Sequence, residues 1–123
     1  MMRLTLHTDR ASYAPGQPVH LRLEVFNDTG EAVHLRFNSS QQYDFEVLWE
    51  DQRLWHWSAD RMFAQVLTEE TLAPGQRQEY EATWNGRLVD GVEAKPGEYV
   101  GRGYLTLSGR VDPMAEESFT VTG

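Results

Sequence analysis

The sequence predicts an all-β protein, an antiparallel β-sandwich of about eight short strands. Apolar and polar residues alternate in several segments, and turn-forming residues separate these segments. The chain has 123 residues, which suits a single domain with one hydrophobic core. We therefore expect residues 1–123 to form one sandwich domain.

The clearest alternation begins at Val19, which is followed at every second position by Leu21, Leu23 and Val25. Because alternate residues of a strand share a face, this run predicts a strand with one buried face. By the same criterion, the predicted strands span residues 4–8, 19–26, 32–38, 43–50, 54–58, 77–84, 98–107 and 118–122. Three proline-glycine pairs precede strands and predict type II turns, at Pro15-Gly16, Pro74-Gly75 and Pro96-Gly97.

The segment from residue 43 to 58 carries three of the four tryptophans. In its first half, apolar side chains share one face of the predicted strand, namely Tyr43, Phe45, Val47 and Trp49. The opposite face carries the carboxylates Asp44, Glu46 and Glu50. We expect the aromatic side chains to form the core, with Trp84 as a partner from the opposite sheet. An exposed aromatic platform for carbohydrate or peptide is the alternative.

In the second half of this segment, Trp55 and Trp57 alternate with His56 and Ser58, as expected for the return strand of a hairpin. A shift of one residue would turn both tryptophans to the opposite face. If both aromatic sets face the same core, the turn must contain an odd number of residues. We therefore expect a three-residue loop over residues 51–53.

Residues 59–67 break the strand pattern. Asp60 could cap a helical turn that places Met62, Phe63 and Val66 on one side, or the segment could be an irregular crossover between two sheets. In the second case the connection suits a Greek-key sandwich. The apolar side chains would then close one end of the core.

Composition excludes several classes of partner. The chain has 19 acidic and 11 basic residues, a net charge of -8, and would repel phosphate backbones and anionic lipid surfaces. We therefore expect neither nucleic acid nor membrane as a partner. The chain contains no cysteine, and its first ten residues lack an apolar run typical of a signal peptide or a membrane span. These features favour a soluble cytoplasmic protein.

His56, Ser58 and Asp60 are the residue types of a nucleophilic triad at alternate positions. Alternate residues of a strand lie about 6.6 Å apart, whereas a nucleophile and its base must come within about 3 Å. No glycine-rich elbow or oxyanion-hole motif surrounds Ser58. We therefore expect no catalytic residues, no cofactor and no enzyme activity.

Three histidines are out of phase with the apolar residues of their strands and should face solvent, namely His7, His20 and His34. The sequence has no HxH spacing and no cysteine, so a zinc site is not expected. Acidic turns such as Glu50-Asp51 leave calcium open, although no EF-hand spacing is present. We expect ordinary solvated side chains and no metal site.

One ordered set of residues resembles a known family, the intracellular proteinase inhibitor domain called BsuPI. The set consists of Phe37, Gln41-Gln42, Phe45, Val47, Ser58, Met62-Phe63, Gln65, Gly75, Trp84, Pro96-Gly97 and Tyr99. The resemblance spans most of the chain. It implies an Ig-like β-sandwich and inhibition of a cytoplasmic subtilisin-type serine peptidase.

An inhibitor of this kind needs a protruding, preorganised segment. The first candidate is the glycine-flanked loop that contains Arg87, Leu88 and Val89, with Leu88 as the large apolar side chain that a subtilisin S1 pocket accepts. The second candidate is Arg61, Met62 and Phe63, although we expect these apolar side chains to be buried.

A different class of function is also compatible with the sequence. A non-inhibitory Ig-like interaction or assembly module would hold another protein through a sheet edge or its acidic surface. The partner is therefore a serine peptidase or another protein. The sequence specifies neither the target nor the oligomeric state.

Overall fold

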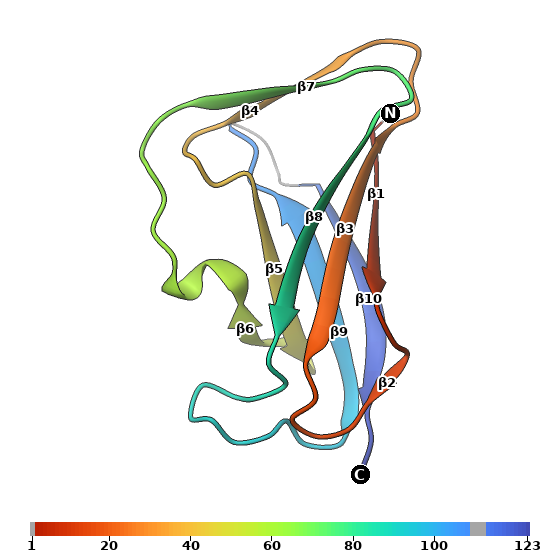
Figure 1. The fold of residues 1–123 in the computed structure, drawn as a ribbon, viewed down its shortest axis with the longest axis vertical. Helices are drawn as coiled ribbons and strands as arrows, with labels where there is room; N and C mark the ends of the chain where they lie inside the picture. The colour runs from red at the N-terminus through yellow and green to blue at the C-terminus, as the bar shows by residue number, and fades with distance from the viewer. Residues whose placement is uncertain (1, 109–112) are drawn as a thin grey trace.

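The computed structural model describes residues 2–108 and 113–123. In these ranges, ten strands and one short 3-10 helix follow one another along the chain (Figure 1). The first five strands are β1 (Met2–Thr8), β2 (Ser12–Tyr13), β3 (Val19–Asn27), β4 (Val33–Phe37) and β5 (Tyr43–Trp49). Next come β6 (Gln52–His56), η1 (Trp57–Asp60), β7 (Thr68–Leu72), β8 (Arg77–Trp84), β9 (Gly97–Leu105) and β10 (Met114–Val121).

Two sheets face each other, which confirms the predicted β-sandwich. The first sheet has the order β1-β3-β8 and the second β2-β10-β9-β5-β6. Within the described residues, neighbouring strands are antiparallel except for β10 and β2, which are parallel. The short ribbon β4-β7 lies at one end of the sandwich, at the top of Figure 1. The sequence pattern missed β2 and β7, and the expected Greek-key connections stay a prediction.

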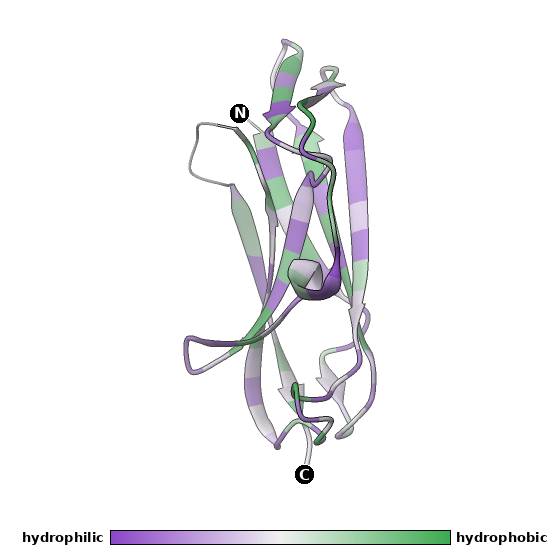
Figure 2. Cartoon of the chain, turned by 90° about the vertical axis from the view of Figure 1, so that its left-hand side faces the viewer, coloured by the Kyte–Doolittle hydropathy of each residue, from purple (hydrophilic) through white to green (hydrophobic). Residues whose placement is uncertain are grey.

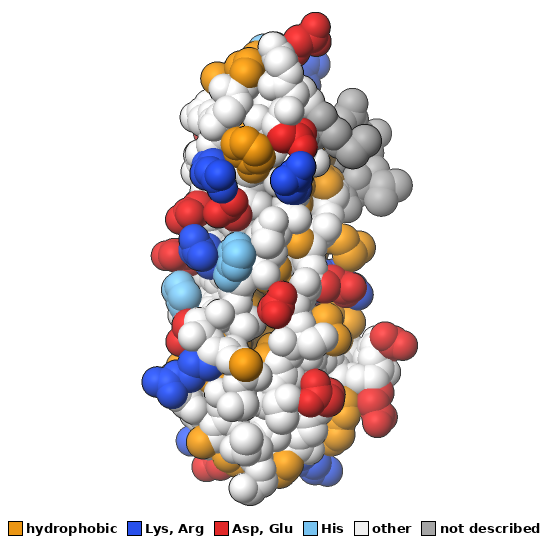
Figure 3. Space-filling model, turned by 90° about the vertical axis from the view of Figure 1, so that its right-hand side faces the viewer, with side chains coloured by type: hydrophobic (Ala, Val, Ile, Leu, Met, Phe, Trp, Pro, Cys, Tyr) orange, Lys and Arg blue, Asp and Glu red, His pale blue; other side chains and the backbone are white. Residues whose placement is uncertain are grey.

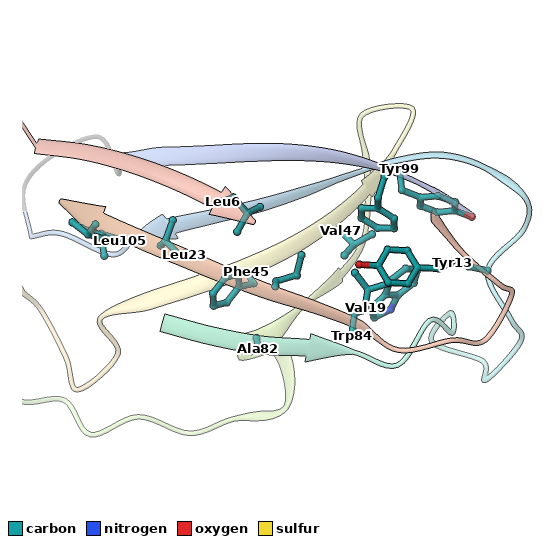
Figure 4. Packing of buried hydrophobic residues seen from close by; sticks show 14 of the residues in the cluster. Leu6, Tyr13, Val19, Leu23, Phe45, Val47, Ala82, Trp84, Tyr99 and Leu105 are labelled. Atoms are coloured by element: carbon teal, nitrogen blue, oxygen red, sulfur yellow. The ribbon is translucent and has the colours of Figure 1, made fainter. Parts of the chain in front are cut away.

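The core lies between the two sheets, as the alternation predicts. On β3, Val19, Leu21, Leu23 and Val25 are almost completely buried, and the intervening residues are half-exposed. Trp84 is fully buried and comes from the first sheet (Figure 4). Its ring neighbours are Tyr99 at 6.0 Å and Phe119 at 6.3 Å, both from the second sheet. The core partners of Trp84 are therefore the aromatics of β9 and β10, and not the tryptophans of residues 43–58.

The tryptophans of residues 43–58 lie at the margin of the core. Trp49, Trp55 and Trp57 are half-buried, and they contact the core from its edge. The ring of Trp57 stacks on Tyr43 at 4.6 Å, and Tyr43 contacts Tyr80 of β8 at 4.5 Å. These rings connect the two sheets on the side where β6 and β8 end them, so the aromatic segment is part core and part rim.

The β5–β6 hairpin turns over two residues, Glu50 and Asp51, and the predicted three-residue loop is wrong. Trp49 pairs with Gln52, and both turn residues have positive φ, 51° and 64°. The additional residue that keeps both aromatic sets on the same face is Leu54, which forms a bulge between the pairs Leu48–Arg53 and Val47–Trp55. The parity requirement was correct, but a bulge satisfies it and lets the turn remain tight.

Two of the three proline-glycine turns form as predicted. Gly16 and Gly75 both have φ of +77°, and the amides of Gln17 and Gln76 close the turns on the carbonyls of Ala14 and Ala73. Gly97 differs, because its φ is 151° and it begins β9. The third type II turn is therefore not formed.

Of the two alternatives for residues 59–67, the irregular crossover forms and the helical turn does not, since η1 ends at Asp60 and the chain continues without regular structure to β7. The expected burial of its apolar residues is wrong for Met62, Val66 and Leu67, which are 99%, 54% and 79% exposed. The β4-β7 ribbon closes this end of the core instead, through the buried side chains Leu35, Phe37 and Leu72.

Candidate functional site

The segment of residues 61–67 runs over the side of the sandwich, from η1 towards the β4-β7 ribbon (Figures 1 and 2). We call it the crossover segment. At its start Arg61 is extended, with φ of -121° and ψ of 151°. The amide of Arg61 donates to the carbonyl of Ser58 at 3.2 Å, and its Nε donates to the carbonyl of Trp57 at 3.2 Å. The guanidinium also lies 4.3 Å from the centre of the Trp57 ring. Arg61 is therefore held at both backbone and side chain.

The middle of the crossover segment is held from two directions. The half-buried ring of Phe63 lies 5.7 Å from that of Trp57. The amide of Ala64 donates to the Ser40 hydroxyl at 2.8 Å, and the Ser40 amide donates to the carbonyl of Ala64 at 2.9 Å. Met62 lies between these held neighbours and is 99% exposed. Of the exposed apolar side chains in the segment, Met62 is thus the one that lies on a braced backbone.

A buried carboxylate fixes η1 against the second sheet. Asp44 is 4% exposed, and its Oδ1 accepts hydrogen bonds from the amides of Phe45 at 2.8 Å and Ser58 at 3.1 Å. Its Oδ2 accepts from the hydroxyls of Ser58 and, at 3.3 Å, Tyr104. Burial, followed by the charges of Asp44 and Glu46, raises the pKa of Tyr104, so this hydroxyl stays protonated and donates. Asp44 therefore connects β5, β9 and the helix that leads into the crossover segment.

This arrangement also shows where the triad-like residues lie. The Ser58 hydroxyl donates a hydrogen bond to Asp44. The alternation of the sequence showed only that Asp44 lies on the strand face opposite the core. The role of Asp44 could not be found from its position, because strand periodicity reports the face of a side chain and not what covers that face. A serine fourteen residues further along the chain, at the end of the predicted strand 54–58, was the only available signal.

The loop between β8 and β9 forms a small hairpin of its own, over residues 86–94. The amide of Leu88 donates to the carbonyl of Val92 at 2.8 Å, and that of Gly91 donates to the carbonyl of Leu88 at 2.9 Å. With Gly91 at φ of +86°, this is the pattern of a three-residue hairpin loop with a glycine bulge. Leu88 is half-buried, while Val89 at the tip is 98% exposed. The most exposed apolar residue of the hairpin is therefore Val89.

The base of this hairpin is fixed to the body of the protein. The Trp84 indole donates to the carbonyl of Arg87 at 3.1 Å, and the amide of Ala94 donates to the carbonyl of Gly86 at 2.9 Å. Gly86 has φ of +75°, and a Cβ there would lie 2.5 Å from the carbonyl oxygen of Gln17. Only glycine permits this close approach to the β2–β3 turn.

The three histidines do not come together. The Nδ1 of His20 lies 3.2 Å from the Thr83 hydroxyl, and that of His34 lies 3.1 Å from the Thr71 hydroxyl. His34 is exposed, whereas His7 and His20 are half-buried. Figure 3 shows acidic, basic and histidine side chains mixed on the side of the molecule opposite the crossover segment. Over the ranges 2–108 and 113–123, no three His, Asp or Glu side chains are grouped so that they could hold a metal ion.

The chain matches the model of a known protein family. The family model for BsuPI, described as intracellular proteinase inhibitor, matches residues 6–109. The chain belongs to this family. The match begins within β1, extends past the end of β9 and includes both the crossover segment and the 86–94 hairpin. No curated protein matches the chain. Within the described part of this BsuPI-family chain, no helix is long and apolar enough to cross a membrane.

Solved structures agree on the Ig-like sandwich fold. The sporulation control protein Spo0M of Bacillus subtilis is 16% identical, with a TM-score of 0.60, over 99% of this chain and 49% of Spo0M. A β-glucosidase from Erythrobacter marinus is 16% identical, with a TM-score of 0.55, over 99% of this chain and 15% of the enzyme. The CARDB domain of the PF1109 protein from Pyrococcus furiosus, solved in complex with di-metal ions, is 10% identical, with a TM-score of 0.54, over 99% of this chain and 93% of the CARDB chain. The chain therefore spans about half of Spo0M and a small part of the glucosidase, and these likenesses concern the fold alone.

Proposed function

We propose that this protein inhibits a subtilisin-type serine peptidase by placing the crossover segment in the active-site cleft. The family supplies the class of activity, since its members are described as intracellular proteinase inhibitors. The observation that carries the choice of segment is Met62, which is 99% exposed between two neighbours that the fold holds. A large apolar side chain suits the S1 pocket of a subtilisin-type peptidase.

The backbone shape also favours the crossover segment over the hairpin. A peptidase cleft takes its substrate as an extended strand that pairs with the enzyme. Arg61 is extended, and the crossover segment belongs to no strand or helix. The 86–94 hairpin instead reverses at its tip, and Leu88 is half-buried beside that turn. The second of the two segments considered from the sequence is thus the better candidate.

Bracing of the segment accounts for inhibition in place of rapid cleavage. A preorganised segment loses little conformational entropy on binding, which favours a tight complex. If the bond between Met62 and Phe63 were cut, both new ends would stay attached to the fold, through Arg61 on one side and Ala64 on the other. The cut ends would therefore remain next to each other in the cleft, and product release would be slow.

We also propose that the target lies in the cytoplasm. The chain contains no cysteine, so its stability does not depend on an oxidising compartment. Its net charge of -8 is compatible with a soluble protein partner and unfavourable for nucleic acid.

The decisive experiment measures inhibition of subtilisin with a chromogenic peptide substrate. We expect stoichiometric, sub-micromolar inhibition by the unaltered protein. Met62→Asp should weaken inhibition by roughly 100-fold, because a charged side chain cannot enter an apolar S1 pocket, whereas Met62→Leu should retain it. Leu88→Asp makes the same change in the other candidate segment, at a half-buried residue.

Two outcomes would contradict the proposal. If no serine peptidase is inhibited at a large molar excess, the inhibitor function is wrong and a non-inhibitory interaction module is favoured. If Leu88→Asp abolishes inhibition and Met62→Asp does not, the inhibitory segment is the hairpin. Because Met62 is fully exposed, thermal unfolding of Met62→Asp should match that of the unaltered protein.

A further inference from the structure

We infer that the 86–94 hairpin is a second contact site for the same peptidase, outside its cleft, with Val89 as the contacting side chain. This inference rests on the proposed inhibitor function. Val89 is 98% exposed at the tip of the hairpin, and Val92 beside it is 54% exposed. Covering an exposed apolar side chain on a rigid support removes apolar surface from water and costs little conformational entropy.

Among the residues that the structure describes, the large exposed apolar side chains are concentrated in two places. The large exposed apolar residues of the described chain are Met62, Val66, Leu67, Val89, Val92 and Met114. All but Met114 belong to the crossover segment or the hairpin. Figure 1 has both segments on the left of the molecule, and Figure 2, which looks at that side, has both towards the viewer. A single partner that approaches this side therefore meets both.

The size of an inhibitor complex requires contacts beyond the crossover segment. Standard interfaces between a peptidase and its inhibitor bury about 800 Å² per partner, from roughly 20 to 30 residues. The crossover segment has only seven residues, so more of the same side must take part. The hairpin is the other protruding element there, and Val89 offers the apolar group that a flat surface beside the cleft would cover.

The hairpin is stiff enough for this role. Its strands are joined by the hydrogen bonds of Leu88 and Ala94, and by an Arg87 guanidinium that donates to the carbonyl of Gly91 at 3.2 Å. Arg87 also lies 3.8 Å from Glu93 across the hairpin. Little conformational freedom remains to be lost when the tip is buried. The partner surface is therefore an apolar patch of the peptidase next to its substrate cleft.

The test compares Val89→Asp with Met114→Asp in binding to subtilisin. Both substitutions add a negative charge at an exposed apolar residue, but Met114 begins β10 outside both segments. We expect Val89→Asp to raise the dissociation constant about tenfold, mainly through faster dissociation, and Met114→Asp to leave it unchanged. Both variants should unfold at the same temperature as the unaltered protein, because neither position is buried.

The outcomes separate this inference from the proposed function. If Met62→Asp abolishes inhibition while Val89→Asp binds like the unaltered protein, the second contact is wrong and the inhibitor function stands. If Met62→Asp has no effect, the proposed segment is wrong, and with it the role of the hairpin as a second site.

A further measurement uses subtilisin with its catalytic serine sulfonylated, which closes S1. Residual binding that is lost in Val89→Asp supports the second contact, and equal binding of Val89→Asp and the unaltered protein contradicts it.

Discussion

At the scale of single residues, Asp44 is the side chain that most constrains the region around the crossover segment. Its carboxylate accepts four hydrogen bonds, two of them from Ser58. The group is almost fully buried, so no bulk water can replace a lost partner. The position of η1, and hence of Arg61, depends on this one acceptor.

Replacing Asp44 by alanine should destabilise the protein by about 3 kcal/mol, because donors from Ser58, Phe45 and Tyr104 would lose their acceptor while remaining buried or half-buried. Ser58→Ala removes a single hydroxyl donor and should cost only about 1 kcal/mol. Urea unfolding followed by tryptophan fluorescence measures both values. A stability of Asp44→Ala within 0.5 kcal/mol of that of Ser58→Ala would show that the carboxylate does not organise this region.

At the scale of elements, the β5–β6 hairpin combines a strained turn with a bulge. Glu50 and Asp51 both adopt left-handed backbone angles, which favour Gly or Asn and cost energy for other residues. The bulge at Leu54 then restores the register that brings Trp55 opposite Val47. The hairpin thus has a strained turn, and its bulge places the aromatic side chains on the face that packs against the core.

Asp51→Gly should stabilise the protein by up to about 1 kcal/mol, because glycine adopts a positive φ without steric cost. Gln52→Gly is the matched control, since its φ is not positive and glycine there should destabilise the strand by about 0.5–1 kcal/mol. Differential scanning calorimetry would show the two variants moving in opposite directions. A lower melting temperature for both would mean that the turn is not strained.

At the scale of the whole molecule, the rings of Tyr80, Tyr43 and Trp57 connect the two sheets along one edge of the sandwich. Burial, with added repulsion from Glu70 and Tyr43, raises the pKa of Tyr80 to about 12. The neutral hydroxyl is therefore favoured in the folded state. In the unfolded chain a tyrosine ionises near pH 10, so the folded protein keeps a proton that the unfolded chain has lost between pH 10 and about 12.

From this difference, the free energy of unfolding should fall as the pH rises from 10 to 12, and Tyr80 should contribute no such dependence below pH 10. Tyr80→Phe removes this contribution, so its stability should fall less steeply over the same range. Urea unfolding at pH 9, 10 and 11 measures both slopes, and the slopes of the two proteins from pH 7 to 9 provide the internal control. Equal slopes above pH 10 would show that Tyr80 ionises alike in both states.

The sequence alone determined the fold class, the principal strands and the family. Alternation such as that from Val19 to Val25 depends only on the twofold geometry of a strand, and the turn at Pro15-Gly16 depends only on local backbone preferences. The alternation also required one additional residue in the β5–β6 hairpin, so that both aromatic sets face the same side. The sequence did not determine that this residue is Leu54, because a three-residue loop and a bulge in the strand meet the requirement equally well.

Only the tertiary structure decided which side chains are covered. Met62 and Asp44 show this most clearly, since the apolar residue is exposed and the charged one is buried. Burial depends on what distant parts of the chain place over a residue: η1 and Tyr104 cover Asp44, while the β4-β7 ribbon fills the end of the core that Met62 was expected to close. For the same reason the hairpin exposes Val89 and partly buries Leu88. The sequence named both candidate segments, but only the folded structure decided which of their side chains are exposed.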